Sequence, residues 1–351
     1  MQSVSFVVES YLYTYNNMIK SLSATAKKIF GSRLYNDIRA NYLFRDLDSP
    51  YPLYPDTPFH MDWSKNTNQQ VNGEEIKAAY IVSPTQRSGT NFLSHMLDKH
   101  PDLVFPSGAN LPDEQCLYTY SEHLKTYAYK TVSTWNKWVD GGEPALQDHA
   151  RSLMGAMGSG ILKYFTQYVK PGSTLLFKTP DAGHLDNFFH LFQESRVVIL
   201  VRDGRDTIES FSKSWGGKGA FRKMCERWSK RVDTMYEFID MAEKAGLKDR
   251  IMITRYDYLN DKPREELPKI FAFLNVNADH YPWDEVDNIP VLGSSSYKGD
   301  QGEVHWKPIE KDEKFKPTQK WLSWDSSRKE IFKKEAGDNL IKLGFADNND
   351  W

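Results

Sequence analysis

The chain has few cysteines and no long apolar run. Its 351 residues include only two cysteines, Cys116 and Cys225. Neither belongs to a CxxC motif or a Cys/His cluster, which argues against a disulfide framework and a structural zinc. No apolar stretch reaches the roughly 18 residues that a membrane span needs. The N-terminal residues lack the basic start and the cleavage site of a secretory signal. We therefore expect a cytoplasmic protein without a membrane span.

The chain also has no excess of charge of either sign. Its 45 Lys and Arg residues oppose 47 Asp and Glu residues, a net charge of −2. A nucleic-acid partner normally requires a basic field over the protein, so we expect none here. Any anion site must be built locally. Apolar residues make up 40% of the sequence, which is enough for a sizeable folded core.

Short apolar runs alternate with helical patterns over most of the chain. The runs predict buried strands at residues 78–83, 174–177, 197–201 and 251–254. Apolar residues at helical spacing follow at residues 92–97, 207–213 and 267–274. Strands that alternate with helices predict an α/β fold, with a mostly parallel central sheet flanked by helices.

Three regions are distinguished by composition. Residues 1–75 read as a helical and then proline-broken N-terminal appendage, which either packs on the core or mediates self-association. Residues 76–351 form the main domain. Within it, residues 107–172 are an aromatic-rich helical insert, expected near the carboxyl ends of the strands, where such sheets bind ligands. Aromatic residues at this spacing form core more often than pocket lining. The sequence leaves the oligomeric state open.

A polar loop, Thr85–Asn91 (TQRSGTN), joins the first predicted strand to a helix. Backbone N–H groups at the helix start, the Arg87 guanidinium and the hydroxyls of Ser88 and Thr90 together suit phosphate or sulfate. Gly89 would permit close approach. The alternative is an ordinary capped helix with a solvated arginine. The loop is not a Walker A motif, because GxxxxGK[ST] is absent.

Two further segments suit an anion. Arg202 follows the strongest predicted strand, and Ser210 lies eight residues later in the next helix. The alternatives are a surface salt-bridge cluster of Arg202 with Asp203, Arg205 and Asp206, or Asp203 as a metal ligand. Residues 294–302 (SSSYKGDQG) form the third segment, which is otherwise an ordinary surface loop.

Together, these motifs resemble those of the sulfotransferases that use 3′-phosphoadenosine 5′-phosphosulfate (PAPS). Pro84–Phe92 resembles their 5′-phosphosulfate loop, and Arg202 with Ser210 matches their 3′-phosphate pair. Lys298 and Gly299 resemble the start of their late 3′-phosphate loop. The segment that contains Tyr256 resembles a Tyr-Glu-Asp-Leu motif of the family. The resemblance covers roughly residues 78–345.

The resemblance implies a P-loop-like sulfotransferase fold and a PAPS-dependent transferase that releases the nucleotide product PAP and needs no metal. Asn91 departs from the family's second threonine, although its amide can still donate to the cofactor. The cofactor-binding residues implied are Arg87, Ser88, Gly89, Thr90, Asn91, Arg202, Ser210, Tyr256, Ser295, Lys298 and Gly299.

The resemblance also implies a catalytic set. Arg87 and Lys178 would stabilise the charge that develops on the bridging oxygen and the leaving phosphate. One branch of the family has its basic histidine two residues after that lysine, but Pro180 stands there in this chain. Other branches use a glutamate, which makes Glu114 the candidate base. Asp113 is the next candidate and His184 the third, and an ordinary surface carboxylate is the alternative for Glu114.

Two other functions stay open at this point: a nucleotide-binding protein of the same fold without catalysis, and a P-loop kinase. For a sulfotransferase, we expect the acceptor to be a hydroxyl or amine of a small molecule. The aromatic residues of the insert favour a hydrophobic or cationic one, and a carbohydrate is an alternative.

Overall fold

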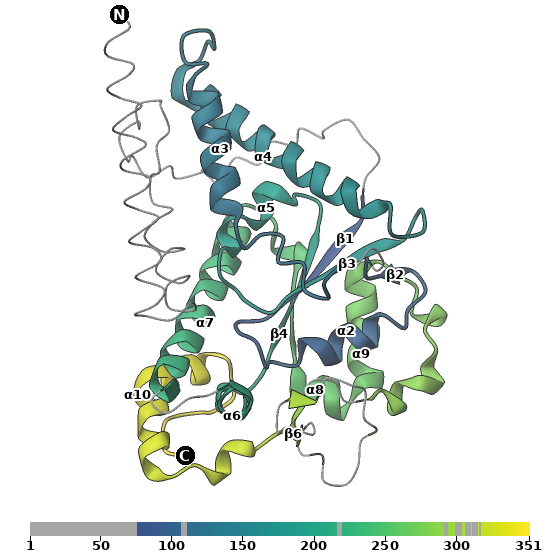
Figure 1. Cartoon of the computed structure of the whole chain (residues 1–351), viewed down its shortest axis with the longest axis vertical. Helices are drawn as coiled ribbons and strands as arrows, with labels where there is room; N and C mark the ends of the chain where they lie inside the picture. Colours follow the sequence, from purple (N-terminus) through teal and green to yellow (C-terminus); the bar gives the residue numbers. More distant parts are fainter. Residues whose placement is uncertain are drawn as a thin grey trace, which may run out of the picture. The chain divides into compact units, whose positions relative to one another are not determined.

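A five-stranded parallel sheet organises the part of the chain that the computed structural model describes, which is residues 76–106, 111–215, 220–290, 294–298, 304–305, 310, 315 and 317–351. The strands are β1 (Ala78–Val82), β2 (Leu103–Val104), β3 (Thr174–Thr179), β4 (Arg196–Val201) and β5 (Ile251–Arg255). Their order is β2-β3-β1-β4-β5, and all neighbours pair in parallel (Figure 1). The predicted α/β fold is confirmed. The two-residue β2 escaped prediction because it is too short to show a pattern.

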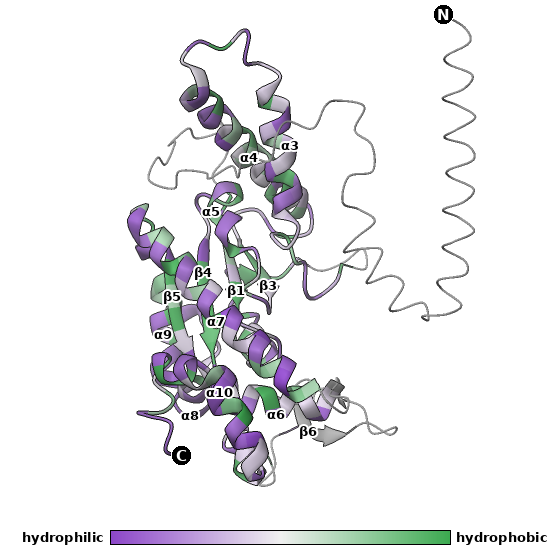
Figure 2. Cartoon of the chain, turned by 90° about the vertical axis from the view of Figure 1, so that its left-hand side faces the viewer, coloured by the Kyte–Doolittle hydropathy of each residue, from purple (hydrophilic) through white to green (hydrophobic). Residues whose placement is uncertain are grey.

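Helices connect the strands and flank the sheet. They are α2 (Thr90–Leu97), α3 (Ser121–Ser133), α4 (Gly142–Thr166), α5 (Phe188–Leu191), α6 (Gly204–Trp215), α7 (Ala220–Lys244), α8 (Tyr256–Asp261), α9 (Pro263–Leu274) and α10 (Ser326–Lys342). Five 3₁₀ segments, among them η2 (Leu185–Asn187) and η6 (Lys320–Ser323), and a small β6–β7 hairpin (Ser294–Lys298 and Val304–His305) complete the described elements. The longer helices carry both hydrophilic and hydrophobic residues, as helices covering a core do (Figure 2).

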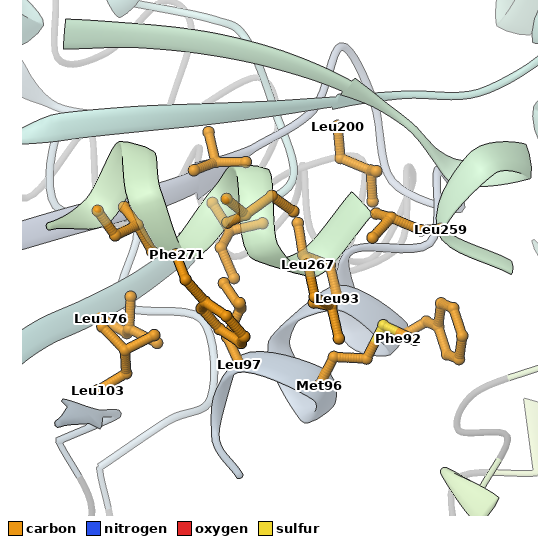
Figure 3. Close-up of a cluster of buried hydrophobic side chains, with 14 of the residues drawn as sticks. Phe92, Leu93, Met96, Leu97, Leu103, Leu176, Leu200, Leu259, Leu267 and Phe271 are labelled. Carbon is orange, nitrogen blue, oxygen red and sulfur yellow. The ribbon is translucent and has the colours of Figure 1, made fainter. Parts of the chain in front are cut away.

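One face of the sheet is covered by α2, α8 and α9. Ile81 of β1, Leu176 of β3 and Leu200 of β4 pack there against Leu93 of α2 and Phe271 of α9 (Figure 3). These side chains are all almost fully buried. Because successive residues of a strand point to opposite faces, the same strands supply a second apolar layer on the other side.

The second face is aromatic. Tyr80 of β1 and Phe177 of β3 lie with their ring centroids 5.0 Å apart. Phe188 of α5 meets the Tyr80 ring edge-on at 4.8 Å, and Phe165 of α4 meets the Phe177 ring at 5.0 Å. Phe238 of α7 packs on Phe188. Helices α4, α5 and α7 therefore cover this face.

Helices α3 and α4 lie within the predicted insert, but most of its aromatic residues lie outside the core. Tyr118 and Phe165 are buried, whereas large rings just before α3, on α3 and α4, and in the turn between them are exposed. The exposed rings are Tyr120, Tyr127, Trp135, Trp138 and Tyr164. The expectation that these rings indicate a hydrophobic or cationic acceptor stays a prediction.

The sheet topology directs several loops to one edge. Strand β1 is central, with β3 on one side and β4 on the other, so the chain direction of the crossovers reverses around it. In open α/β sheets, ligands bind at the carboxyl ends of the strands beside such a reversal. The predicted appendage, residues 1–75, lies outside the described residues. Among the described helices, none is long and apolar enough to cross a bilayer.

Candidate functional site

The loop after β1 places a helix N-terminus at the carboxyl edge of the sheet. Arg87 and Gly89 adopt positive φ angles of 71° and 96°, and α2 begins at Thr90. The Ser88 hydroxyl donates to the Thr85 carbonyl over 2.8 Å, which holds the turn. No side chain caps α2. The first N–H groups of α2 and its dipole therefore favour an anion in front of the loop.

The side chain of Tyr256, the first residue of α8, packs against this loop at Gly89. A Cβ atom on Gly89 would lie 2.2 Å from the Tyr256 Cδ2, so only glycine fits there. The buried Tyr256 ring also lies 4.8 Å from the guanidinium carbon of Arg202. The predicted cofactor residue Tyr256 thus contacts two other predicted site residues, and its own contact with a cofactor stays a prediction.

Arg87, Arg202 and Ser210 come together from three segments. The Arg87 Nε donates to the Ser210 Oγ over 3.1 Å. The Arg202 Nη1 donates to the Arg87 carbonyl over 2.8 Å. Burial, and next the charge of Arg202, lower the pKa of Arg87 to about 10. Two neighbouring guanidinium groups in a partly desolvated position repel each other, and a bound anion would relieve that repulsion.

The direction of the Arg87 side chain is set by the fold. The resemblance assigns Arg87, with Lys178, to the charge that develops on the bridging oxygen and the leaving phosphate, and that role stays a prediction. In the structure, the Arg87 guanidinium contacts Ser210, on the side of the predicted 3′-phosphate pair. Sequence could not show this, because the direction of a long side chain at a positive-φ residue depends on the surrounding fold.

Lys178 lies at the end of β3, between two partners. Its ammonium donates to the Asn91 Oδ1 over 2.5 Å and lies 3.8 Å from the Glu114 Oε1. The lysine is only 5% exposed. Burial lowers the pKa of Lys178, and Glu114 partly offsets this. The Asn91 side-chain oxygen accepts from Lys178, a contact that sequence reasoning missed. The expected donation from the Asn91 amide nitrogen to the cofactor stays a prediction.

Of the three candidate bases, Glu114 is the one that forms an ion pair with Lys178. Burial raises the pKa of Glu114, Lys178 lowers it, and Asp113 raises it. Asp113 is exposed, and His184 is an exposed residue at the start of η2. The electrostatic influence of His184 falls on Glu122 and Asp186. The geometry therefore favours Glu114.

The acidic residues beside Arg202 have structural partners. Asp203 forms an ion pair with Arg205 over 2.6 Å. Asp206 accepts the backbone N–H groups of Gln319 and Lys320 over 2.8 and 2.6 Å. The salt-bridge interpretation of this motif thus applies to Asp203 and Arg205. Arg202 instead bridges Arg87 and the Pro317 carbonyl.

The late loop is described only in part. Ser295 and Lys298 belong to β6, which pairs antiparallel with β7 and lies against α6. Gly299 lies outside the described residues. The assignment of these three residues to cofactor binding stays a prediction.

The structure is that of an α/β protein whose loops gather Arg87, Arg202 and Ser210 at one end and Asn91, Lys178 and Glu114 at the other. Residues 81–280 match the sequence profile of the Sulfotransferase family. The match covers more than half of the chain, and the protein belongs to this family.

Several curated relatives are sulfotransferases by name. The chain is 24% identical over 258 residues to the protein-tyrosine sulfotransferase of Drosophila melanogaster, covering 72% of this chain and 48% of that protein. It is 25% identical to protein-tyrosine sulfotransferase 1 of Danio rerio, covering 68% and 62%. The chain thus spans about half to three fifths of these relatives. It is also similar to the sulfotransferase domain of the Synechococcus PCC 7002 olefin synthase, with a TM-score of 0.48 and 19% identity over 79% of this chain and 98% of that one.

Proposed function

We propose that this protein transfers a sulfuryl group from PAPS to a phenolic hydroxyl. One observation carries the proposal: the loop of residues 87–91 contacts both halves of the site. At one end, Arg87 contacts Ser210 and Arg202. At the other end, Asn91 contacts Lys178, which pairs with Glu114. The first half suits the phosphate groups of a nucleotide, and the second suits acid–base work beside them.

The residues present fit such a nucleotide. PAPS carries anionic groups at both the 3′ and 5′ positions, and it supplies an activated sulfuryl group. Arg202 and Ser210 would hold the 3′-phosphate, with the Arg87 guanidinium beside them. The N–H groups at the start of α2 would hold the 5′ end. Tyr256 and Gly89 position these groups through the packing described above.

Lys178 supplies positive charge at the reacting end. A buried ammonium stabilises negative charge more strongly than a solvated one, because water does not screen it. Asn91 fixes its position over 2.5 Å. Lys178 must be protonated for this role. Burial lowers the pKa of Lys178 from the ordinary 10.5. As the pH is raised, the rate should therefore begin to fall at a lower pH than it would if this lysine were solvated.

Glu114 acts as the general base that takes the proton of the acceptor hydroxyl. It must be deprotonated, and burial raises its pKa above the ordinary 4.5. A raised pKa makes a carboxylate a better base near neutral pH. Lys178, 3.8 Å away, keeps the deprotonated form accessible.

The chemistry of this base favours a phenol over an aliphatic alcohol. A phenol has a pKa of about 10, which is lower than that of an aliphatic alcohol. The transfer of its proton to a carboxylate therefore costs less free energy than the transfer of an alcohol's proton. Two of the relatives above are protein-tyrosine sulfotransferases by name, and a tyrosine side chain is a phenol. The acceptor expected from sequence, a small molecule, would then be a small phenol.

The test is an acceptor panel with labelled PAPS, comprising small phenols, aliphatic alcohols, amines and a tyrosine-containing peptide, run with EDTA. We expect mass spectrometry to find one added sulfuryl group on phenolic acceptors. Transfer to alcohols or amines but not to phenols would contradict the acceptor class. Binding of PAP without transfer to any acceptor would support the non-catalytic alternative. Transfer of a phosphoryl group from ATP with a strict Mg²⁺ requirement would support the kinase.

A further inference from the structure

A segment far along the chain, residues 317–324, is fixed against α6 beside Arg202. Asp206 of α6 accepts the N–H groups of Gln319 and Lys320 over 2.8 and 2.6 Å. The indole N–H of Trp324 donates to the Glu209 Oε2 over 2.7 Å, a buried contact. The Pro317 carbonyl accepts a hydrogen bond from Arg202. Four hydrogen bonds therefore tie this segment to α6 and to Arg202, two positions before α6 begins.

A stacked pair strengthens the attachment. The Arg205 guanidinium lies 3.9 Å from the centre of the Trp321 ring, and it is oriented by its ion pair with Asp203. Gln319 adopts a positive φ of 61°, which turns the chain just before η6. Lys320 thus lies between a residue bonded to Asp206 and a residue stacked on Arg205, and its backbone has little freedom.

The side chain of Lys320 shares its surroundings with the predicted phosphate site. Burial lowers its pKa to about 7, and Arg202 is the next cause. Lys213 and Arg87 lower it as well, whereas Asp206 raises it. Lys213 is offset by its own ion pair with Glu209 over 3.0 Å. Hydrogen bonds join the same residues: Arg202 donates to the Arg87 carbonyl and to the Pro317 carbonyl, and the Lys320 N–H donates to Asp206, which also faces Arg202. Arg87, Arg202 and Lys320 therefore converge from three separate segments.

Such a cluster is costly when no anion is bound. Its members repel one another where water screens them poorly. A phosphate with two negative charges would offset the repulsion and use the donors of all three side chains.

We propose that Lys320 is a ligand of the nucleotide's 3′-phosphate, together with Arg202 and Ser210. The inference rests on the proposed function, because it assigns a further residue to that nucleotide site. Because Lys320 would contact only the 3′ end of the nucleotide, it should distinguish nucleotides with a 3′-phosphate from those without one.

The test compares PAP with adenosine 5′-phosphate (AMP) by calorimetric titration on the full chain. The variants are Lys320→Met, Lys320→Arg and, as a matched control, Lys262→Met. The Lys262 side chain is 62% exposed, just after the last residue of α8. We expect Lys320→Met to weaken PAP binding by about 10- to 100-fold, the loss of one charged hydrogen bond, with AMP binding unchanged. Lys320→Arg and Lys262→Met should bind PAP within about threefold of the unchanged chain.

A second readout needs no destabilising substitution. The charged groups that face Lys320 are Arg202, Arg87, Lys213 and Asp206. Phosphate binding favours the protonated ammonium, so PAP affinity should fall as the pH rises above about 7. The phosphate itself is already doubly charged above about pH 6. Lys320→Arg should remove this decline, since arginine stays protonated.

The outcomes separate the two proposals. Equal losses of PAP and AMP affinity in Lys320→Met would show a purely structural role and overturn the inference. Unchanged PAP affinity would do the same, as would a PAP affinity of the unchanged chain that is flat between pH 7 and about 9. Failure of the unchanged chain to bind PAP at all would instead refute the proposed function.

Discussion

The Lys178 ammonium donates to the side-chain oxygen of Asn91 over 2.5 Å. This contact joins the end of β3 to the first turn of α2 and places a buried cation beside the helix N-terminus. An asparagine oxygen favours the protonated lysine without neutralising its charge. We therefore assign Asn91 to positioning Lys178.

Asn91→Ala should shift the alkaline limb of the pH–rate profile. Loss of the acceptor destabilises the protonated form, so the pKa of Lys178 falls further below 10.5. A charged hydrogen bond of about 1.5–3 kcal/mol corresponds to about one to two pH units. Asn91→Asp, which retains an oxygen and adds a negative charge, should move the limb the other way. An alkaline limb that is the same in all three proteins would contradict this role.

Glu114→Gln should lower the turnover number by about 10²- to 10⁴-fold, the usual contribution of a general base. The acid limb of the profile, where the rate rises with pH through the raised pKa of Glu114, should disappear. PAP affinity should stay nearly the same. The control is Asp113→Asn at the exposed neighbouring carboxylate. If Asp113→Asn rather than Glu114→Gln removes the acid limb, the base has been misassigned.

Gly89→Ala should damage both stability and nucleotide binding. Its new methyl group would lie 2.2 Å from the buried Tyr256 ring, at a φ of 96° that disfavours alanine. We expect a loss of about 2 kcal/mol or more in unfolding free energy, from backbone strain and overpacking. Gly160→Ala is the matched control, because a Cβ there meets no atom within 4 Å. In helix α4, that change should stabilise by about 0.5–1 kcal/mol. Urea unfolding of both variants checks the difference.

Arg202→Ala should weaken PAP binding by about 1.5–3 kcal/mol, as expected for a lost charged hydrogen bond. It also removes the contacts with the Arg87 and Pro317 carbonyls, so the late segment should loosen as well. Arg196, at the opposite end of the same strand, provides the control. Calorimetry that gives equal PAP affinities for Arg202→Ala and Arg196→Ala would refute the assignment of Arg202.

Local patterns in the sequence were sufficient to predict the principal strands and the loops that end them. The apolar runs at β1, β3, β4 and β5 are short and bounded by polar residues. The local sequence therefore predicts each strand without information from distant parts of the chain. The motif at Arg87–Asn91 likewise depends on neighbours in sequence. The exposed rings of α3 and α4 show the limit of this reasoning, because helical spacing alone cannot tell which face another element covers.

The amino-acid sequence by itself determined the parallel α/β sheet, the anion loop and the candidate set of Lys178, Glu114, Arg202 and Ser210. Only the tertiary structure decided that Arg87 turns toward Ser210, that Asn91 holds Lys178, and that the Pro317 carbonyl accepts a hydrogen bond from Arg202. The physical reason is the range of the interactions. Periodicity and turn chemistry act between neighbours in sequence, whereas these contacts join residues about ninety or more positions apart, and their geometry exists only after the sheet has brought its strand ends together.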